Sequence, residues 1–468
     1  MAEGKHVVIL GAGPAGYVGA LRAAQLGMKV TVVDNRPLGG TCLNRGCIPT
    51  KALLGSAAVV RMMDRAEEYG IQVRVEDVSW PAMRERSEKV VARLVRGIDA
   101  LFKAAGVRFV SGDGRIGDER TVVVAAPAGE ESITGDFVLV ATGSEAARPR
   151  SLFGQENDGR PARIVTSDQA LKLEELPMRA LIVGGGYIGC EFASLWSDLG
   201  VEVIMVEMLD RLLILSDETA SEETYKALKR RGVKIRLGTK IERLTETGEG
   251  VKAELSEGES IEADVALVAV GRKLNSDVKG LAELGVKLKD GAVRIDSHAR
   301  TNVNGVFAAG DVTGEILLAH YATHAGIVAV ENMAGIDRQV EKRVVPSCVF
   351  TNPDIGQVGL SEREAREKLG EIRVGRFDFA HLGKALAMGE PEGFVKVVAD
   401  ARNDEVVGVI VVGHEASSLI GEAAMAMRMH AKLSDVAEMI HAHPTMPEGI
   451  MEAMLDAMGR SLHKIYRK

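Results

Sequence analysis

The sequence is poor in cysteine, with only Cys42, Cys47, Cys190 and Cys348 among its 468 residues. Four cysteines are too few to hold a chain of this length together, which excludes a disulfide-rich scaffold. The sequence also lacks any stretch of the ~18 uninterrupted apolar residues that a membrane helix needs. Positive charge is not in excess, since the net charge is −8, whereas nucleic-acid binding favours a basic surface. We therefore expect neither a membrane nor a nucleic acid as a partner.

The N-terminus leaves no room for a targeting peptide. Its first residues, Met-Ala-Glu-Gly-Lys, lead directly into an apolar segment that starts at His6, whereas a signal peptide places a charged region and a longer apolar region before its cleavage site. We therefore expect a cytoplasmic protein. In a reducing compartment, two cysteines that lie close in sequence are more often catalytic or metal-binding than structural.

Glycine, in contrast, is abundant. The chain has 52 glycines among its 468 residues, which is more than an average usage of about 7% would give. The chain also exceeds the roughly 250–300 residues at which a single hydrophobic core stops growing. An apolar strand at His6–Leu10, a glycine turn, a helix at Gly16–Leu26 and a strand at Lys29–Asp34 form a βαβ unit. The same order returns at Ala180–Glu207, which predicts two separate nucleotide-binding domains.

The chain from Arg343 onward has a different pattern. Strands are expected at Cys348–Thr351, Arg373–Phe379, Gly393–Val398 and Glu405–Val412, with helices after them. Strands that are segregated from helices predict an α+β domain. Earlier in the chain, the segment Glu145–Arg163 is rich in Arg, Pro, Gly and Asn, which is typical of a linker.

The first glycine turn is a G-x-G-x-x-G sequence formed by Gly11, Gly13 and Gly16. The first glycine permits the tight turn, the second lets the backbone approach a pyrophosphate, and the third lets helix and strand pack closely. The helix N-terminus then faces the phosphates. An acidic residue is expected about 20 residues further on to bind a ribose hydroxyl, and Asp34 stands there.

The second glycine turn repeats this spacing with Gly184, Gly186 and Gly189, and its acidic residue is Glu207. A carboxylate at that position favours a free 2′-hydroxyl and repels a 2′-phosphate, so we expect NAD rather than NADP. A glycine-rich turn in an unrelated α/β fold is the alternative, but each copy has the strand, helix and acid that the motif requires. Two such domains predict two cofactors, for which a flavin and a hydride carrier are the usual combination.

The cysteine pair follows the first βαβ unit, with Cys42 and Cys47 in the sequence GGTCLNRGCIPTK. A helix is expected near Pro49. Cysteines at a helix N-terminus, with Lys51 close by, are expected to have lowered pKa values. Two ordinary buried cysteines and a zinc half-site are the alternatives, but no matching Cys/His pair lies nearby. We therefore favour a redox disulfide and expect no metal site.

With these motifs in place, essentially the whole chain resembles the two-dinucleotide disulfide oxidoreductases, which include dihydrolipoamide dehydrogenase, glutathione reductase and mercuric reductase. The resemblance rests on the cysteine motif, on ATGS at Ala141–Ser144, on VGR at Val270–Arg272, on TNVNGVFAAGD at Thr301–Asp311 and on HAHPTMPE at His441–Glu448. It implies FAD in the first nucleotide-binding domain and NAD in the second. It also implies a homodimer joined through the C-terminal domain.

The resemblance assigns cofactor-binding residues position by position. Those implied for FAD are Gly11, Gly13, Gly16, Asp34, Gly40, Thr41, Lys51, Thr142, Gly143, Gly310, Asp311 and Ala319. Those implied for NAD are Gly184, Gly186, Ile188, Gly189, Glu207 and Gly271. Lys51 is expected to pair with Glu191. The implied domains are residues 1–145 and 271–342 for FAD, 146–270 for NAD and 343–468 for the dimer interface.

The resemblance also implies the catalytic residues. His443 of one subunit would act as acid and base in the other subunit's active site, oriented by Glu448. Cys42 would be the thiol that exchanges with the substrate, and Cys47 the one nearer the flavin. A histidine can take a thiol proton near neutral pH, and a carboxylate fixes its tautomer. The alternative is that His441 and His443 are ordinary loop residues.

Within the family, the dihydrolipoamide dehydrogenase branch fits best. The chain ends in Arg467-Lys468 without the C-terminal cysteine pair of mercuric reductase, and Glu207 stands where an NADP-dependent glutathione reductase needs positive charge. We therefore expect oxidation of dihydrolipoyl groups, carried on a lipoyl-domain protein of a multienzyme complex. A reductase of another small disulfide and a non-catalytic flavoprotein scaffold are the alternatives, and the intact cysteine, histidine and glutamate set argues against the scaffold.

Some positions depart from that branch. Tyr321 and His324 stand where Lys and Glu are usual, residues 380–388 read AHLGKALAM, and Pro447 replaces a common Ser. These departures do not touch the redox motifs. They leave the identity of the disulfide substrate open, because these positions can change the channel through which a substrate enters or the surface that contacts a partner.

Overall fold

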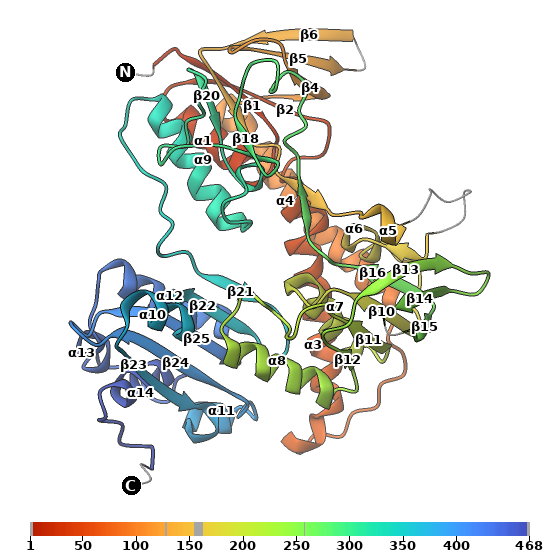
Figure 1. Ribbon diagram of the computed structural model, residues 1–468, viewed down its shortest axis with the longest axis vertical. Helices are drawn as coiled ribbons and strands as arrows, with labels where there is room; N and C mark the ends of the chain where they lie inside the picture. The colour runs from red at the N-terminus through yellow and green to blue at the C-terminus, as the bar shows by residue number, and fades with distance from the viewer. Residues whose placement is uncertain (1–2, 127–128, 154–161, 257, 466–468) are drawn as a thin grey trace.

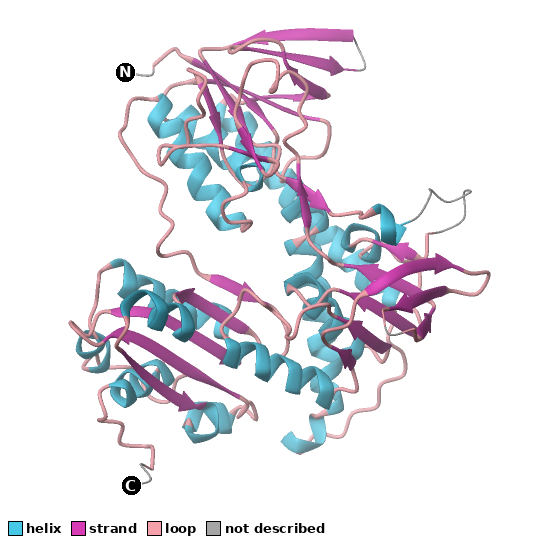
Figure 2. Cartoon of the chain, viewed as in Figure 1, coloured by secondary structure: helices cyan, strands magenta, loops and turns pink. Residues whose placement is uncertain are grey.

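The computed structural model describes residues 3–126, 129–153, 162–256 and 258–465, which form three lobes (Figure 1). The first lobe holds the N-terminus, the second follows it along the chain, and the third holds the C-terminal region. Helices flank sheets in each lobe (Figure 2). No helix in these described segments is both long and apolar enough to cross a membrane.

The first lobe is built on a five-stranded parallel sheet in the order β20-β7-β1-β2-β3. Its strands are β1 (His6–Leu10), β2 (Lys29–Asp34), β3 (Arg108–Ser111), β7 (Phe137–Val140) and β20 (Val306–Ala308). Val7, Val8 and Ile9 are fully buried, because both faces of the sheet are covered and the strand therefore needs a continuous apolar run. Strand β20 returns from beyond the second lobe, so two separated stretches of chain complete one sheet.

Helices cover one face of this sheet and a small sheet covers the other. On one face, α1 (Pro14–Gln25) packs along α9 (Ala319–Met333). On the other, an antiparallel sheet of β4 (Asp113–Ile116), β5 (Thr121–Ala126) and β6 (Gly129–Thr134) shares a core cluster with β1. The carboxyl end of β1 is thereby fixed between two packed layers, and the first glycine turn leaves the sheet at that point.

The second lobe repeats this architecture, with the parallel strand order β12-β11-β10-β16-β9. Its strands are β9 (Ile164–Val165), β10 (Arg179–Val183), β11 (Glu202–Val206), β12 (Lys234–Arg236) and β16 (Val265–Val268). Its two main helices are α7 (Tyr187–Asp198) and α8 (Glu218–Arg230). The second glycine turn joins β10 to α7, as the first joins β1 to α1.

The third lobe is an antiparallel sheet in the order β21-β22-β25-β24-β23, on which helices pack. Its strands are β21 (Ser347–Val349), β22 (Ile355–Gly359), β23 (Ile372–Asp378), β24 (Gly393–Asp400) and β25 (Val406–Gly413). Its helices are α10 (Glu362–Leu369), α11 (Gly383–Ala387), α12 (Ala416–Arg428), α13 (Leu433–Ala437) and α14 (Glu448–Ala457). The predicted fold class, two Rossmann-like domains and an α+β domain, is confirmed.

The remaining elements connect the lobes or extend them. The helices are α2 (Gly40–Arg45), α3 (Cys47–Asp64), α4 (Trp80–Ala105), α5 (Arg150–Phe153) and α6 (Ser167–Ala170). The strands are β8 (Ser144–Ala146), β13 (Ile241–Glu246), β14 (Val251–Leu255), β15 (Ser260–Ala263), β17 (Arg272–Leu274), β18 (Leu288–Lys289) and β19 (Ala292–Val293). The predicted linker at 145–163 contains β8 and α5 at its start, and its residues 154–161 lie outside the described residues.

A buried ion pair fixes the third lobe to the second. Lys396 of β24 places its Nζ 2.7 Å from Oδ1 of Asp217, the N-cap of α8, and these side chains are 4% and 2% exposed. Glu362 at the start of α10 lies 3.4 Å from the same Nζ. Removing one partner of a buried pair costs about 3–5 kcal/mol because the other charge is left uncompensated. This contact therefore resists displacement of the two lobes.

Candidate active site

In the first dinucleotide turn, two glycines are required by the protein itself. Gly11 has a φ of +104°, and a Cβ there would lie 2.2 Å from the carbonyl oxygen of Ala141. A Cβ on Gly16 would lie 1.8 Å from the carbonyl oxygen of Gly11. Both distances are far inside van der Waals contact, so glycine is required at 11 where the turn passes the end of β7 and at 16 where α1 packs on the turn.

The second turn shows the same packing at its outer glycines and free space at its middle one. A Cβ on Gly184 would lie 2.5 Å from the oxygen of Ala269, and one on Gly189 would lie 2.0 Å from the oxygen of Gly184. Gly186 has an ordinary φ of −75°, and no heavy atom lies within 4 Å of a Cβ built there. Protein packing does not explain this glycine. Open space at the helix N-terminus fits the approach of a dinucleotide pyrophosphate.

The two acidic residues brace the two turns in the same way. Asp34 accepts the backbone N–H of Ala12 at 2.7 Å, and Glu207 accepts the backbone N–H of Leu209 at 2.8 Å as well as that of Gly185. Burial raises the pKa of Asp34 and outweighs the hydrogen bonds that lower it. Each carboxylate therefore stands at the end of the second strand of its βαβ unit, as predicted.

Alanine substitutions in the second turn are expected to separate cofactor binding from packing. Gly186→Ala should raise the KM for NAD+ at least about tenfold, equivalent to ~1.4 kcal/mol, and leave the thermal unfolding temperature unchanged, because its Cβ meets no protein atom. Gly189→Ala is the matched control and should lower the unfolding temperature. Steady-state kinetics and thermal denaturation measure both effects. An unchanged KM in Gly186→Ala would contradict the assignment of this space to the dinucleotide.

The cysteine segment packs directly against the first turn. A Cβ on Gly40, whose φ is +60°, would lie 2.5 Å from Cα of Gly13, so this close approach requires glycine. Cys42 then lies within α2, and Cys47 is the first residue of α3. Both are free thiols, and neither is fully buried. The prediction that a helix starts near Pro49 is confirmed, because α3 begins two positions earlier, at Cys47.

The two thiols differ in pKa, although a lowered pKa was predicted for both. The prediction is confirmed for Cys47 only. The hydrogen bond from Cys42 is the largest cause that lowers the pKa of Cys47 to about 7, and the charge of Lys51 adds to it against the effect of burial. The expectation of a lowered pKa is wrong for Cys42. As donor to Cys47, and as a partly buried thiol beside a thiolate, Cys42 has a pKa well above its ordinary value.

Lys51 connects the cysteine segment to the second and third lobes. Its Nζ lies 2.7 Å and 2.8 Å from the two carboxylate oxygens of Glu191 on α7, which confirms the predicted pairing. Phe350 adds two contacts, since its backbone N–H donates to Glu191 at 3.1 Å and its ring centroid lies 4.4 Å from Nζ. Phe350 was not predicted, because it lies 159 positions from Glu191 and no local pattern marks it.

Replacing Lys51 with methionine is expected to move the titration of Cys47 to higher pH. With the pKa lowered to about 7, the thiolate is present above that pH and is lost as the pH falls through it. Removing the cation takes away part of this stabilisation, so the midpoint should rise by about one pH unit or more. Ultraviolet thiolate absorbance of the dithiol protein measures the midpoint, and Lys51→Arg is the control that keeps the charge. An unchanged midpoint in Lys51→Met would contradict this role.

Residues of the second predicted flavin motif meet the ATGS segment. Asp311 accepts a hydrogen bond from the hydroxyl of Ser144, which in turn accepts one from Nε of Arg272 at 2.7 Å. Gly143 and Gly271 have positive φ, and no heavy atom lies within 4 Å of a Cβ built on either. The two glycines therefore border open space beside the polar cluster that Ser144, Asp311 and Arg272 form.

Two further residues predicted for FAD, Thr142 and Thr41, lie beside this cluster, and a third, Ala319, begins a helix. Thr142 donates its hydroxyl to the oxygen of Asn275 at 2.6 Å, and Thr41 donates to the oxygen of Ser144 at 3.4 Å. Ala319 is the first residue of α9, a helix whose N-terminus has no side-chain cap and can therefore accept the partial negative charge of a ligand. Ser144, which joins Asp311 to Arg272, lies in the quoted ATGS segment but was not among the residues predicted to bind a cofactor.

His443 and Glu448 lie in the third lobe at the start of α14. Nδ1 of His443 lies 2.9 Å from Oε1 of Glu448, and Oε2 of Glu448 accepts the backbone N–H of Thr445 at 2.8 Å. Burial acts to raise the pKa of Glu448, but the hydrogen bonds from Thr445 and His443 outweigh it and lower the pKa. The carboxylate therefore fixes the orientation of the ring and leaves Nε2 free to exchange a proton.

Within one chain, the histidine and the cysteines are not brought together. The side chain of His443 is 78% exposed, and in the described part of the chain no hydrogen bond joins it to Cys42 or Cys47. Helix α14 packs on β23, β24 and α13 of its own lobe. The described part of one chain therefore leaves the histidine and the thiols in separate lobes.

The positions that depart from the predicted branch have structural partners. Tyr321 is 2% exposed and packs in the core of the first lobe. His324 accepts the backbone N–H of Glu341 at 3.0 Å, and the oxygen of Met388 accepts the hydroxyl of Tyr69 at 2.6 Å. The residues at these three positions therefore take part in packing or hydrogen bonding between separate segments of the chain.

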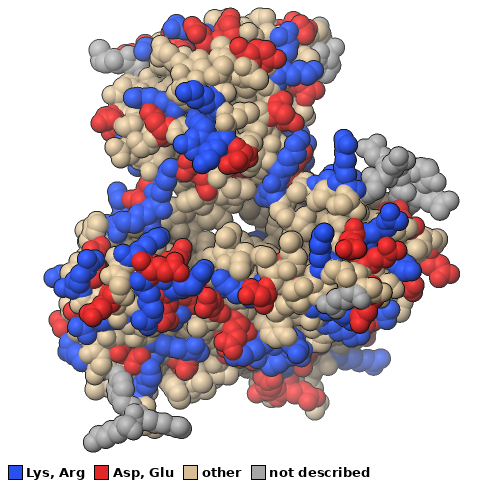
Figure 3. All heavy atoms as spheres, viewed as in Figure 1, with Lys and Arg blue, Asp and Glu red and all other residues tan. Residues whose placement is uncertain are grey.

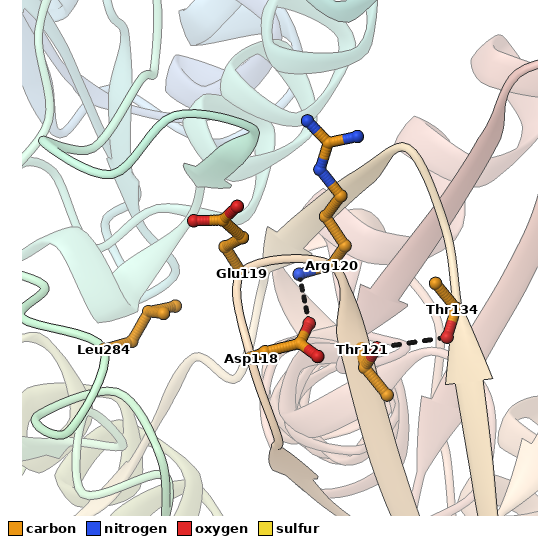
Figure 4. A pocket seen from close by; sticks show the side chains of 6 residues that line it. All are labelled: Asp118, Glu119, Arg120, Thr121, Thr134 and Leu284. Atoms are coloured by element: carbon orange, nitrogen blue, oxygen red, sulfur yellow. Dashed lines mark hydrogen bonds between the residues drawn. The ribbon is translucent and has the colours of Figure 1, made fainter.

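One pocket on the surface of the first lobe is lined by none of the predicted site residues. This shallow pocket at the β4–β5 turn (Figure 4) is lined by Asp118, Glu119, Arg120, Thr121, Thr134 and Leu284. Its polar contacts are internal: Arg120 N–H donates to Asp118 at 2.8 Å, and the Thr121 and Thr134 hydroxyls lie 3.0 Å apart. On the face seen in Figure 3, acidic and basic side chains are interspersed.

Comparison with known proteins agrees with this geometry over nearly the whole chain. Residues 5–326 match the family model described as pyridine nucleotide-disulphide oxidoreductase. Residues 345–454 match the model of the dimerisation domain of such proteins. Residues 327–344 lie between the two matches and run from within α9 of the first lobe toward the third lobe.

Individual relatives are similar over their full length. The chain is 39% identical to a dihydrolipoyl dehydrogenase of Bacillus subtilis, covering 99% of this chain and 100% of the relative. It is 38% identical to the mitochondrial dihydrolipoyl dehydrogenase of Pisum sativum, covering 98% and 92%. The crystal structure of LpdA from Mycobacterium tuberculosis superposes with a TM-score of 0.90 at 29% identity, covering 96% and 99%. The HOCl-induced flavoprotein disulfide reductase RclA of Escherichia coli gives a TM-score of 0.85 at 25% identity, covering 96% and 99%.

Proposed function

The chain belongs to the pyridine nucleotide-disulphide oxidoreductase family, and we propose that it acts as a dihydrolipoyl dehydrogenase with Cys42, Cys47, His443 and Glu448 as its catalytic residues. It oxidises a dihydrolipoyl dithiol to the cyclic disulfide and reduces NAD+. FAD, when bound, accepts the electron pair from the protein thiols and passes it to NAD+ as a hydride. The proposal fits relatives named dihydrolipoyl dehydrogenase at 37–39% identity.

The observation that carries the proposal is the pair of thiols, Cys42 and Cys47, whose segment packs against the first glycine turn beside Lys51. The reaction starts from the Cys42–Cys47 disulfide. A substrate thiolate attacks Cys42, forming a mixed disulfide and releasing Cys47 as a thiolate, as thiol–disulfide exchange requires. The second substrate thiol then displaces Cys42. The positive charge of the neighbouring Lys51 lowers the pKa of Cys47 and stabilises this leaving thiolate, and a lower leaving-group pKa speeds exchange.

His443 of the partner subunit supplies the proton-transfer group in this proposal. It takes a proton from the substrate thiol, and Glu448 orients its ring and stabilises the imidazolium that forms. The exposed ring of His443 and its distance in the fold from its own cysteines support a composite active site. The dimerisation domain matched at residues 345–454 supports a homodimer in which two such sites form.

The chain's own residues hold the cofactors at the two glycine turns. We assign FAD to the first turn, with Asp34, Lys51, the ATGS segment, Asp311 and Ala319. We assign NAD to the second turn, with Gly186, Ile188, Glu207 and Gly271. Glu207 disfavours a 2′-phosphate because its carboxylate would face a second negative charge.

The test is a substrate and cofactor panel on the purified protein. NADH formation from dihydrolipoamide and NAD+ is followed by absorbance, with NADP+ and with glutathione in parallel. We expect fast turnover with dihydrolipoamide and NAD+ and slow turnover with either replacement. If NADH reduces the protein but dihydrolipoamide does not react with it, the proposed substrate is wrong and the family assignment still holds. Preference for NADP+ would overturn the role of Glu207.

A further inference from the structure

An aromatic side chain of the third lobe lies over the lysine of the cysteine helix. Lys51 stands four positions after Cys47 on α3, so the two side chains are neighbours on one face of that helix. Nζ of Lys51 binds both carboxylate oxygens of Glu191 on α7, at 2.7 Å and 2.8 Å. The ring of Phe350, which directly follows β21, has its centroid 4.4 Å from the same Nζ. This distance is well inside the ~6 Å limit of a cation–π contact.

Packing of apolar side chains does not account for the position of this ring. Phe350 is partly exposed. In the part of the chain that the structure describes, it joins none of the buried apolar clusters, although Val349 and Ile355 on either side of it belong to one. The contact with the ammonium group of Lys51 is therefore the interaction that explains an aromatic residue at this position.

The backbone around Phe350 is held against α7 independently of the ring. The N–H of Phe350 donates to Oε1 of Glu191 at 3.1 Å. The N–H of Asn352 donates to Oγ of Ser194, about one turn further along α7, at 3.3 Å. Neither bond uses the side chain of residue 350. A substitution there therefore changes the contact with Lys51 and leaves the attachment of the segment to α7 in place.

The ring restricts an ammonium group that would otherwise be mobile and hydrated. A lysine carries its charge on a flexible four-carbon stem, and the side chain of Lys51 is 30% exposed. Charges interact more weakly through water than through protein. The charge of Lys51 lowers the pKa of Cys47, whereas the charge of Glu191 raises it. The position and hydration of Nζ therefore affect the net field at the thiol.

We propose that Phe350 is a positioning residue of the redox centre, whose ring holds the ammonium group of Lys51 beside Cys47 and thereby stabilises the Cys47 thiolate that the reaction releases. This inference rests on the proposed function, in which Cys47 is the leaving thiolate. It gives the third lobe a part in the redox centre of its own chain, besides the proposed contribution of His443 to the partner subunit.

The test is a pH titration of Cys47 in the holoenzyme, followed by ultraviolet thiolate absorbance in a Cys42→Ser background, where no disulfide can form between the two positions. Phe350→Leu removes the ring and keeps an apolar side chain, so the midpoint should rise by about half a pH unit. Phe350→Tyr keeps a ring and should restore the midpoint. Burial raises the pKa of Cys348 to about 11 and that of Cys190 further, so these thiols do not titrate in the same range.

Two controls separate an action through Lys51 from a general loosening of the protein. Phe153→Leu removes another ring beside a cation, 4.5 Å from Cζ of Arg148 in the second lobe, and should leave the midpoint unchanged. Lys51→Met combined with Phe350→Leu should have the midpoint of Lys51→Met alone, because the ring acts through the lysine. Such a double-mutant cycle measures the coupling between the two side chains.

The pattern across these variants decides the outcome. A rise in Phe350→Leu that is absent in Phe350→Tyr, and that disappears when Lys51 is replaced, supports the proposal. An unmoved midpoint in Phe350→Leu, or an equal rise in Phe153→Leu or on top of Lys51→Met, would overturn it. If Phe350→Leu does not fold, Phe350→Met decides in its place. The titration needs no substrate, so a failure to oxidise dihydrolipoamide would overturn the proposed function alone, and the midpoint would still judge Phe350.

Discussion

Replacing His443 with glutamine should lower the turnover of dihydrolipoamide by about 10²–10⁴-fold, the range that a positioned acid–base group contributes. Glutamine keeps a hydrogen-bonding side chain of similar size but cannot take up the thiol proton. The bond to Glu448, at 2.9 Å in the unmodified protein, shows that the ring is already oriented. The loss should therefore fall on kcat, measured by steady-state NADH formation from dihydrolipoamide.

The control for this variant is the half-reaction that does not involve the substrate thiols. Rapid mixing of His443→Gln with NADH should bleach the flavin at the unmodified rate. If flavin reduction falls as much as dihydrolipoamide turnover does, His443 supports the structure and is not the proton-transfer group. Glu448→Gln should show the same pattern with a smaller loss, because it orients the ring without accepting the thiol proton.

Replacing Cys42 with serine is expected to abolish dihydrolipoamide turnover, with a loss of at least about 10³-fold, as for removal of an essential nucleophile. A hydroxyl at residue 42 cannot form the disulfide that the substrate reduces. It could still donate a hydrogen bond to Cys47, so the thiolate of Cys47 should persist. Steady-state turnover and ultraviolet thiolate absorbance measure the two effects.

Cys348→Ala is the matched control for the cysteine variant. Cys348 is also a partly buried free thiol, and burial raises its pKa to about 11, so it is a poor nucleophile at neutral pH. We expect its replacement to leave turnover close to that of the unmodified protein. Residual disulfide-dependent turnover in Cys42→Ser, or a full loss in Cys348→Ala, would contradict the assignment of the redox pair.

The dinucleotide turns could be predicted because local sequence determines them. The strands expected at His6–Leu10 and Lys29–Asp34 have these bounds in the structure, and the expected helix starts two positions earlier, at Pro14. Proline is favoured in the first helical turn because its missing N–H is not needed there. The glycines at 11 and 16 and the acid at 34 lie within one βαβ unit, so spacing alone brings them together.

Features that depend on distant contacts could not be predicted. Strand β22 was missed because Gly356 and Gly359 lower its strand propensity, yet Gly356 is needed where the backbone oxygen of Ala416 would lie 2.4 Å from a Cβ. The opposite acidity of Cys42 and Cys47 depends on which thiol donates, which the spacing of two cysteines does not reveal. The role of Phe350 follows only from the packing of the third lobe on α7.

The central claim is that one active site combines Cys42 and Cys47 of one subunit with His443 of the other. Its most direct test is a hybrid dimer of one Cys42→Ser subunit and one His443→Gln subunit, purified through two different tags. Each parent dimer should be nearly inactive. The hybrid joins an intact Cys42 to an intact His443 at one of its two sites, so about half of the unmodified turnover per dimer is predicted from its symmetry. A hybrid no more active than its parents would contradict the composite active site.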